Sequence, residues 1–126
     1  MTEPSFSSEA YNPDRLIGGD QKLITRDITL TDISTTGALT RGTVLGMITA
    51  SGKYGISLTA SVDGSQTPRA ILVKDADPSG GDITASIYDE GEFNQDTLVY
   101  GTGHDADSVR EDLRAVGIHL KDPVSI

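Results

Sequence analysis

The chain has 126 residues, none of them cysteine or tryptophan, and carries a formal charge of −9 at pH 7 from 19 acidic and 10 basic residues. The length predicts one domain with a modest core, the charge argues against nucleic acid and anionic membranes as partners, and the missing cysteines exclude disulfides and thiolate zinc sites. No stretch approaches the roughly 18 apolar residues of a membrane span, and the first residues lack a signal-peptide pattern, so we expect no membrane partner and synthesis in the cytoplasm.

Residues 1–20 are predicted to form a flexible amino-terminal arm without a core of its own, because they are rich in serine, proline and glycine and poor in apolar side chains. Fifteen extended residues reach about 50 Å. Such an arm could lie across a neighbouring protein and add a strand to an exposed sheet edge. The candidate anchors for this binding are its four large apolar residues, Phe6, Tyr11, Leu16 and Ile17.

The remaining residues, 21–126, are predicted to form a β-rich domain. Its first strand spans residues 23–30, in which Ile24, Ile28 and Leu30 share one face and polar residues mostly occupy the other. This alternation is typical of a half-buried strand.

A β-hairpin is predicted next. Residues 43–49 are apolar on both faces and rich in β-branched side chains, which indicates a strand covered on both sides, and Gly46 marks a bend or a close approach of another segment. Residues 50–53 have turn composition and lead into a second strand. That second strand alternates through Tyr54, Ile56 and Leu58.

The middle of the chain continues as short strands separated by loops. Loops are predicted at residues 63–68 and 75–82 from their turn residues, and each is followed by an apolar run. In the second run Ile83, Ala85 and Ile87 alternate. A further turn is expected between Gly91 and Asn94, followed by a strand over residues 97–101, which brings the expected number of strands to about seven.

One short helix is predicted near the carboxy-terminal end. Val109, Leu113 and Val116 follow the i, i+4, i+7 spacing of a narrow apolar stripe. Asp105 or Ser108 would cap its start, and Gly117 lies where a left-handed residue ends a helix. Ile118 and Leu120 continue as a final strand or tail.

Motifs that carry chemistry are weak in this sequence. Asp75, Asp77 and Ser79 copy part of a calcium loop, but Ser86 stands where a bidentate glutamate should complete it, so no metal is expected. His104, Asp105 and His119 could form an acid–base pair only if the fold brought them together, and no nucleophile or nucleotide motif accompanies them. The sequence therefore predicts no cofactor and no enzyme.

Six segments spread over residues 11–122 resemble the lambda-type head decoration proteins of tailed phages, the protein D family. Their order and spacing across the chain carry the resemblance more than any one of them does. The segments are YNPDRLIGGD, LTRGTVLGMIT, GKY, DGSQTPRAIL, GEFN and GTGHDADSVREDLRAVGIHLKD.

The resemblance implies a mainly β, β-clip-like bent-ribbon or incomplete barrel domain with one short helix, and a homotrimer. The trimer would bind the major capsid protein on the exterior of the expanded shell, at threefold and quasi-threefold positions, and stabilise the head against packaged-DNA pressure. The arm at residues 1–20 would become ordered on the capsid. The negative charge agrees with an exterior place on the virion, since packaged DNA would repel the protein inside. A virion-surface module for carbohydrate or host adhesion is the alternative.

Overall fold

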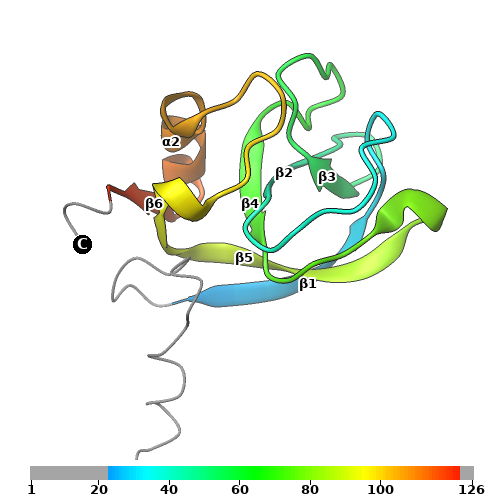
Figure 1. Ribbon diagram of the computed structural model, residues 1–126, viewed down its shortest axis with the longest axis horizontal. Coiled ribbons are helices and arrows are strands. Elements are labelled where there is room, and N and C mark those ends of the chain that lie inside the picture. Colours follow the sequence, from blue (N-terminus) through cyan, green and yellow to red (C-terminus); the bar gives the residue numbers. More distant parts are fainter. Residues whose placement is uncertain (1–22, 123–126) are drawn as a thin grey trace, which may run out of the picture.

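The computed structural model describes residues 23–122. The predicted arm at residues 1–20 and its candidate anchors Phe6, Tyr11, Leu16 and Ile17 lie outside these residues. Within them the fold is mainly β, with one α-helix and two short 3-10 helices (Figure 1). The elements are β1 (Ile24–Leu30), β2 (Val44–Met47), β3 (Tyr54–Ile56), β4 (Pro68–Leu72), η1 (Pro78–Gly80), β5 (Ile83–Asn94), η2 (Gln95–Thr97), α2 (Ala106–Ala115) and β6 (Ile118–Lys121).

Five of the strands close into a small barrel. The strand order is β1-β3-β2-β4-β5, and β5 returns to pair with β1, so that the sheet has no free edge along this part. All seven residues of β1 pair antiparallel with β5, from Ile24 opposite Glu90 to Leu30 opposite Ile83. Figure 1 shows β1 and β5 side by side along the lower side of the molecule. The mainly β, barrel-like prediction is therefore confirmed.

The strand β5 is long enough to pair within two sheets. Its first part closes the barrel against β1, whereas its last four residues pair in parallel with β6, from Gly91 opposite Ile118 to Asn94 opposite Lys121. The helix α2 packs against β4 and β6. The carboxy-terminal elements thus form a second layer outside the barrel.

The core has two parts, one for each layer. Leu30, Leu45 and Leu72 belong to the cluster inside the barrel and are fully buried. Phe93 and Leu113 belong to the second cluster, between the barrel and the α2–β6 layer. Burial of one such side chain contributes about 1.5–3 kcal/mol, so the second cluster is what holds the helix on the barrel.

The predicted hairpin is confirmed as β2 and β3, with Leu45 opposite Ile56 and Met47 opposite Tyr54. The close approach expected at Gly46 is found, together with an irregularity in the strand pairing. The pairing of β2 with β4 shifts register between Leu45 and Gly46, and a Cβ at Gly46 would overlap the carbonyl oxygen of Ser65. The loop that contains Ser65 therefore lies directly on β2, which explains why this serine is buried.

Two predictions in the middle of the chain are wrong. The strand β5 runs through Gly91 to Asn94 without a turn, and the chain turns only at η2. The predicted strand at residues 97–101 reduces to a single bridge between Val99 and Thr43. Gly91 is needed for close approach within a strand, because a Cβ there would contact the side chains of Leu23 and Phe93.

Candidate functional site

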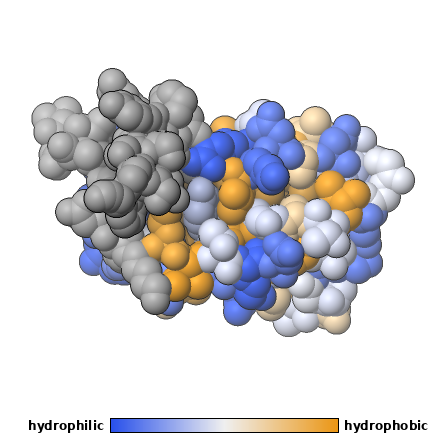
Figure 2. Space-filling view, turned by 90° about the horizontal axis from the view of Figure 1, so that it is seen from below, coloured by the Kyte–Doolittle hydropathy of each residue, from blue (hydrophilic) through white to orange (hydrophobic). Residues whose placement is uncertain are grey.

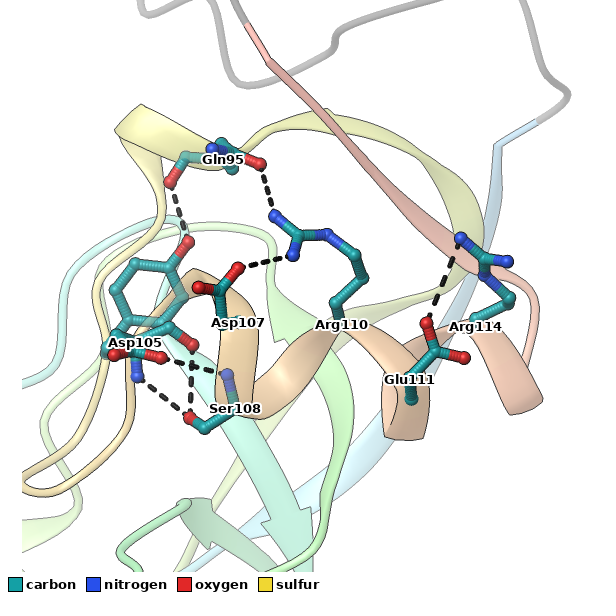
Figure 3. Close-up of polar contacts among 8 residues, drawn as sticks. Gln95, Asp105, Asp107, Ser108, Arg110, Glu111 and Arg114 are labelled. Atoms are coloured by element: carbon teal, nitrogen blue, oxygen red, sulfur yellow. Dashed lines mark hydrogen bonds and ion pairs between the residues drawn. The ribbon is translucent and has the colours of Figure 1, made fainter.

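The helix α2 is fixed at both ends in the way the sequence predicts. The Asp105 carboxylate accepts a hydrogen bond from the Ser108 backbone N–H at 2.8 Å, and the Ser108 hydroxyl accepts one from the Asp105 N–H at 2.9 Å. Asp105 is therefore the capping residue (Figure 3). Gly117 follows the helix with a positive φ of 96°, and Val109 and Leu113 are buried. The direction in which the outer side chains of α2 point is set by this framework.

Arg110 on α2 is held in place by two neighbours. Its Nη1 donates to Asp107 Oδ1 at 2.6 Å and its Nη2 donates to Gln95 Oε1 at 2.8 Å. The Tyr100 hydroxyl donates to the Gln95 carbonyl oxygen at 2.7 Å. Figure 3 shows the Arg110 guanidinium between Asp107 and Gln95. These contacts connect the helix to η2.

Burial raises the pKa of Tyr100 to about 12, and the nearby Asp96 carboxylate acts in the same direction. The tyrosine therefore stays neutral over the physiological range. Its hydroxyl remains a hydrogen-bond donor, which keeps Gln95, and through it Arg110, in position.

A shallow pocket of about 260 Å³ lies between α2 and β6, and we call it the α2–β6 pocket. Arg114 contributes from the helix, where its only ion pair with another described residue is a 4.0 Å contact with Glu111. The side chains of His119 and Lys121 make no hydrogen bond or ion pair with any residue in the described part of the chain. The pocket is lined by Glu92, Arg110, Arg114, His119, Leu120 and Lys121.

His104 does not meet His119. Its Nε2 lies 3.0 Å from the Gln66 carbonyl oxygen and 3.2 Å from Ser57 Oγ, and its Nδ1 lies 2.9 Å from Ser108 Oγ. A carbonyl oxygen only accepts hydrogen bonds, so Nε2 carries the hydrogen and cannot take a proton from Ser57. The His104 side chain therefore connects the residue after β3, the loop that contains Gln66 and the first turn of α2, and it does not activate Ser57 as a nucleophile.

The residues of the predicted calcium-like loop bond within the protein. Asp75 Oδ1 accepts from the Arg41 N–H at 2.8 Å, and Asp77 Oδ1 accepts from the Ser79 N–H at 3.0 Å, where it caps η1. Hydrogen bonds from Ser79 lower the pKa of Asp77. Ser86 instead donates to Asp27 at 2.7 Å. Within residues 23–122, no group of three or more histidine and acidic side chains is placed to hold a metal ion.

The described chain begins at Leu23, one residue before β1. Leu23 is 38 % exposed and contacts Gly91, so the chain enters the barrel at the point where β5 passes from β1 to β6. Any segment that precedes Leu23 starts from this surface.

On the face shown in Figure 2, apolar areas are separated by hydrophilic ones. Large apolar side chains are exposed at only three described positions, Leu23, Val62 and Val99. Across residues 23–122, the structure contains no helix of the length and apolar character needed to cross a membrane.

The sequence shows how the residues that line the α2–β6 pocket are spaced within each element, but it does not show that the two elements lie together. Arg110 and Arg114 are four residues apart on the helix, and His119 and Lys121 are two apart on the strand, so each pair shares a face. Only the fold shows that both pairs line one pocket.

The chain matches one family model, described as Bacteriophage lambda head decoration protein D, over residues 5–119. None of the curated proteins compared with it matches.

Proposed function

Because the chain belongs to the bacteriophage lambda head decoration protein D family, with the structural role in the phage capsid that this implies, we propose that it binds as homotrimers to the exterior of the expanded shell. Each trimer would occupy a threefold or quasi-threefold position, contact the major capsid protein and stabilise the head against packaged-DNA pressure. The observation that carries this proposal is the family match over residues 5–119. The mainly β fold agrees with it.

The proposed attachment uses residues 1–20 as an arm, with Phe6, Tyr11, Leu16 and Ile17 as contacts to the shell. Main-chain pairing with an exposed strand of the capsid protein would supply affinity. Ordering such a segment costs about 1–2 kcal/mol per residue in backbone entropy, so one arm alone would bind weakly. Three arms on one trimer raise the effective concentration of each arm and convert weak contacts into durable attachment.

Net charge supports the exterior placement. A chain with a formal charge of −9 is repelled by packaged DNA, and a trimer triples that charge. The outer surface of the shell is solvated and tolerates it.

A non-enzymatic role is supported by the polar clusters. The Nε2 of His104 is committed to the Gln66 carbonyl, which leaves Ser57 without a base. Asp75 and Asp77 bond to backbone N–H groups of their own surroundings.

The direct test mixes the purified full-length protein with expanded, undecorated shells and images them by electron microscopy. We expect stoichiometric density at the threefold and quasi-threefold positions, and sedimentation of the free protein at the mass of a trimer. Shells that remain bare would contradict the proposed function.

A second experiment tests the arm. Deletion of residues 1–15 should abolish shell binding while leaving the far-ultraviolet circular dichroism of the domain unchanged. Undiminished binding by this deletion variant would show that another surface attaches the protein.

A further inference from the structure

We propose that the α2–β6 pocket binds an extended, carboxylate-bearing segment of another protein, which adds to the outer edge of β6. Its carboxylates would contact Arg110, Arg114 and Lys121. This inference goes beyond the proposed function, because it concerns a different surface from the arm and holds whichever protein supplies the segment.

The first argument is charge. Residues 23–122 contain eight lysines and arginines, and three of them line this one pocket together with one of the two histidines. Among the residues that the structure describes, Glu92 is the only acidic one in the lining. Asp107 and Glu111 pair with the two arginines from outside the lining, so the lining itself carries more positive than negative charge and favours acidic segments over basic ones.

The second argument is that these cations have donors to spare. Arg110 has five N–H donors, and its bonds to Asp107 and Gln95 occupy one nitrogen each, so the guanidinium is held in place with donors that no other described residue uses. The 4.0 Å contact of Arg114 with Glu111 joins two largely exposed side chains and is weak. Lys121 has no partner among the described residues. A carboxylate can therefore bind without first breaking a strong ion pair.

The third argument is spacing. Arg110 and Arg114 lie one helical turn apart, about 5.4 Å along the axis. His119 and Lys121 lie two residues apart on one face of β6, about 6.6 Å along the strand. In an extended ligand, every second side chain recurs at the same interval as in β6. A segment with acidic residues at alternate positions would match the spacing of the two arginines and that of the strand residues lining the pocket.

The fourth argument is the edge of the sheet. Within the described residues, β6 pairs with β5 and with no other strand, so the N–H and C=O groups along its outer edge are open to a further strand. A lysine on an edge strand can also serve only to prevent aggregation. A single lysine would suffice for that role, whereas here two arginines from a separate helix line the same pocket as the strand.

The test titrates the full-length protein, labelled with nitrogen-15, with a blocked hexapeptide of alternating glutamate and valine. We expect chemical-shift changes concentrated at residues 118–121 and at the arginine side chains of positions 110 and 114. A hexapeptide of alternating lysine and valine should produce none. Equal binding of the two peptides, or shifts that map to another surface, would overturn the proposal.

Two matched double variants distinguish binding at the α2–β6 pocket from non-specific electrostatic attraction of the peptide to the protein. Arg114→Gln with Lys121→Gln should weaken binding of the glutamate peptide at least about tenfold, the effect of losing two charge-assisted contacts. Arg69→Gln with Lys74→Gln removes the same charge from exposed positions elsewhere and should leave binding unchanged within about twofold. Equal weakening by both would refute the site. Shells play no part in these measurements, so their outcome is distinct from that of the decoration experiment.

Discussion

Arg26 of β1 binds Asp89 of β5 through two nitrogens, with Nε 2.7 Å from Oδ2 and Nη2 3.1 Å from Oδ1, across the seam at which the barrel closes. The Tyr54 hydroxyl on β3 accepts a third hydrogen bond from Arg26 Nη2 at 3.0 Å. Hydrogen bonds to Asp89 and then Tyr54 raise the pKa of Arg26 above its ordinary value. One side chain thus connects three strands of the barrel.

Replacing Arg26 with methionine should therefore lower the free energy of unfolding by about 1 kcal/mol. Two-point contact with a carboxylate is stronger than a simple ion pair, but both groups are partly exposed and water screens them. Urea denaturation provides the measurement. Lys53→Met is the control, because Lys53 contacts Asp82 at 2.6 Å through one nitrogen between exposed side chains, and it should cost less than half as much. Equal losses would contradict a special role for the seam.

The close contact at Gly46 leads to a second prediction. Gly46→Ala should lower the free energy of unfolding by about 3 kcal/mol or more, because the new Cβ overlaps the backbone carbonyl of Ser65, which cannot move without displacing its loop. Gly80→Ala is the control. A Cβ at Gly80 meets nothing within 4 Å, so its effect should stay within about 0.5 kcal/mol. Thermal unfolding of the two variants compares them directly, and a mild effect at Gly46 would mean that the loop is not packed as described.

The raised pKa of Tyr100 leads to a prediction about the stability of the fold at alkaline pH. Its pKa is raised from 10.0 to about 12 in the folded protein, mainly by burial, so the neutral side chain stabilises the fold fully below pH 10. This contribution is lost as the pH rises from 10 to about 12. Tyr100→Phe should remove that part of the pH dependence and also the bond to Gln95. Denaturation at several alkaline pH values measures it, and a variant that loses stability over this range as the wild type does would refute the assignment.

The lowered pKa of Asp63 leads to a prediction about the stability of the fold at acidic pH. Its Oδ1 accepts hydrogen bonds from the Ser65 hydroxyl at 2.6 Å and the Ser65 N–H at 3.0 Å, and these lower the pKa of Asp63 from its ordinary 3.8. The ionised carboxylate therefore stabilises the fold above pH 3.8, and this stabilisation is lost as the pH falls through the lowered value. Asp63→Asn should flatten the dependence of stability on pH in this range. Ser65→Ala, which removes only the hydroxyl, should flatten it partly.

The sequence predicts well those structural features that depend on interactions between residues close together in the chain. The Asp105 cap, the left-handed Gly117 and the β2–β3 turn each depend on residues within a few positions of one another. The alternation of apolar residues in β1 was equally readable, because its inner face lies on the core. The mainly β class followed from such local patterns.

Features decided by distant pairing were not predictable. Gly91 and Asn94 have the composition of a turn, yet Ile118 and Lys121 pair with them and keep β5 extended. The strand expected at residues 97–101 has only Thr43 as a bridge partner. The α2–β6 pocket likewise requires that β6 return beside the helix, a fact that no spacing within either element contains.

The antiparallel ladder between β1 and β5 has a mechanical consequence. The strand β1 begins one residue after Leu23, so a force applied at Leu23 along the strand direction would load the β1–β5 ladder in shear. To yield, β1 would have to slide past β5 with all seven of its residue pairs loaded together, instead of peeling away one at a time. The β1–β5 ladder therefore resists a pulling force applied at the amino-terminal end of β1.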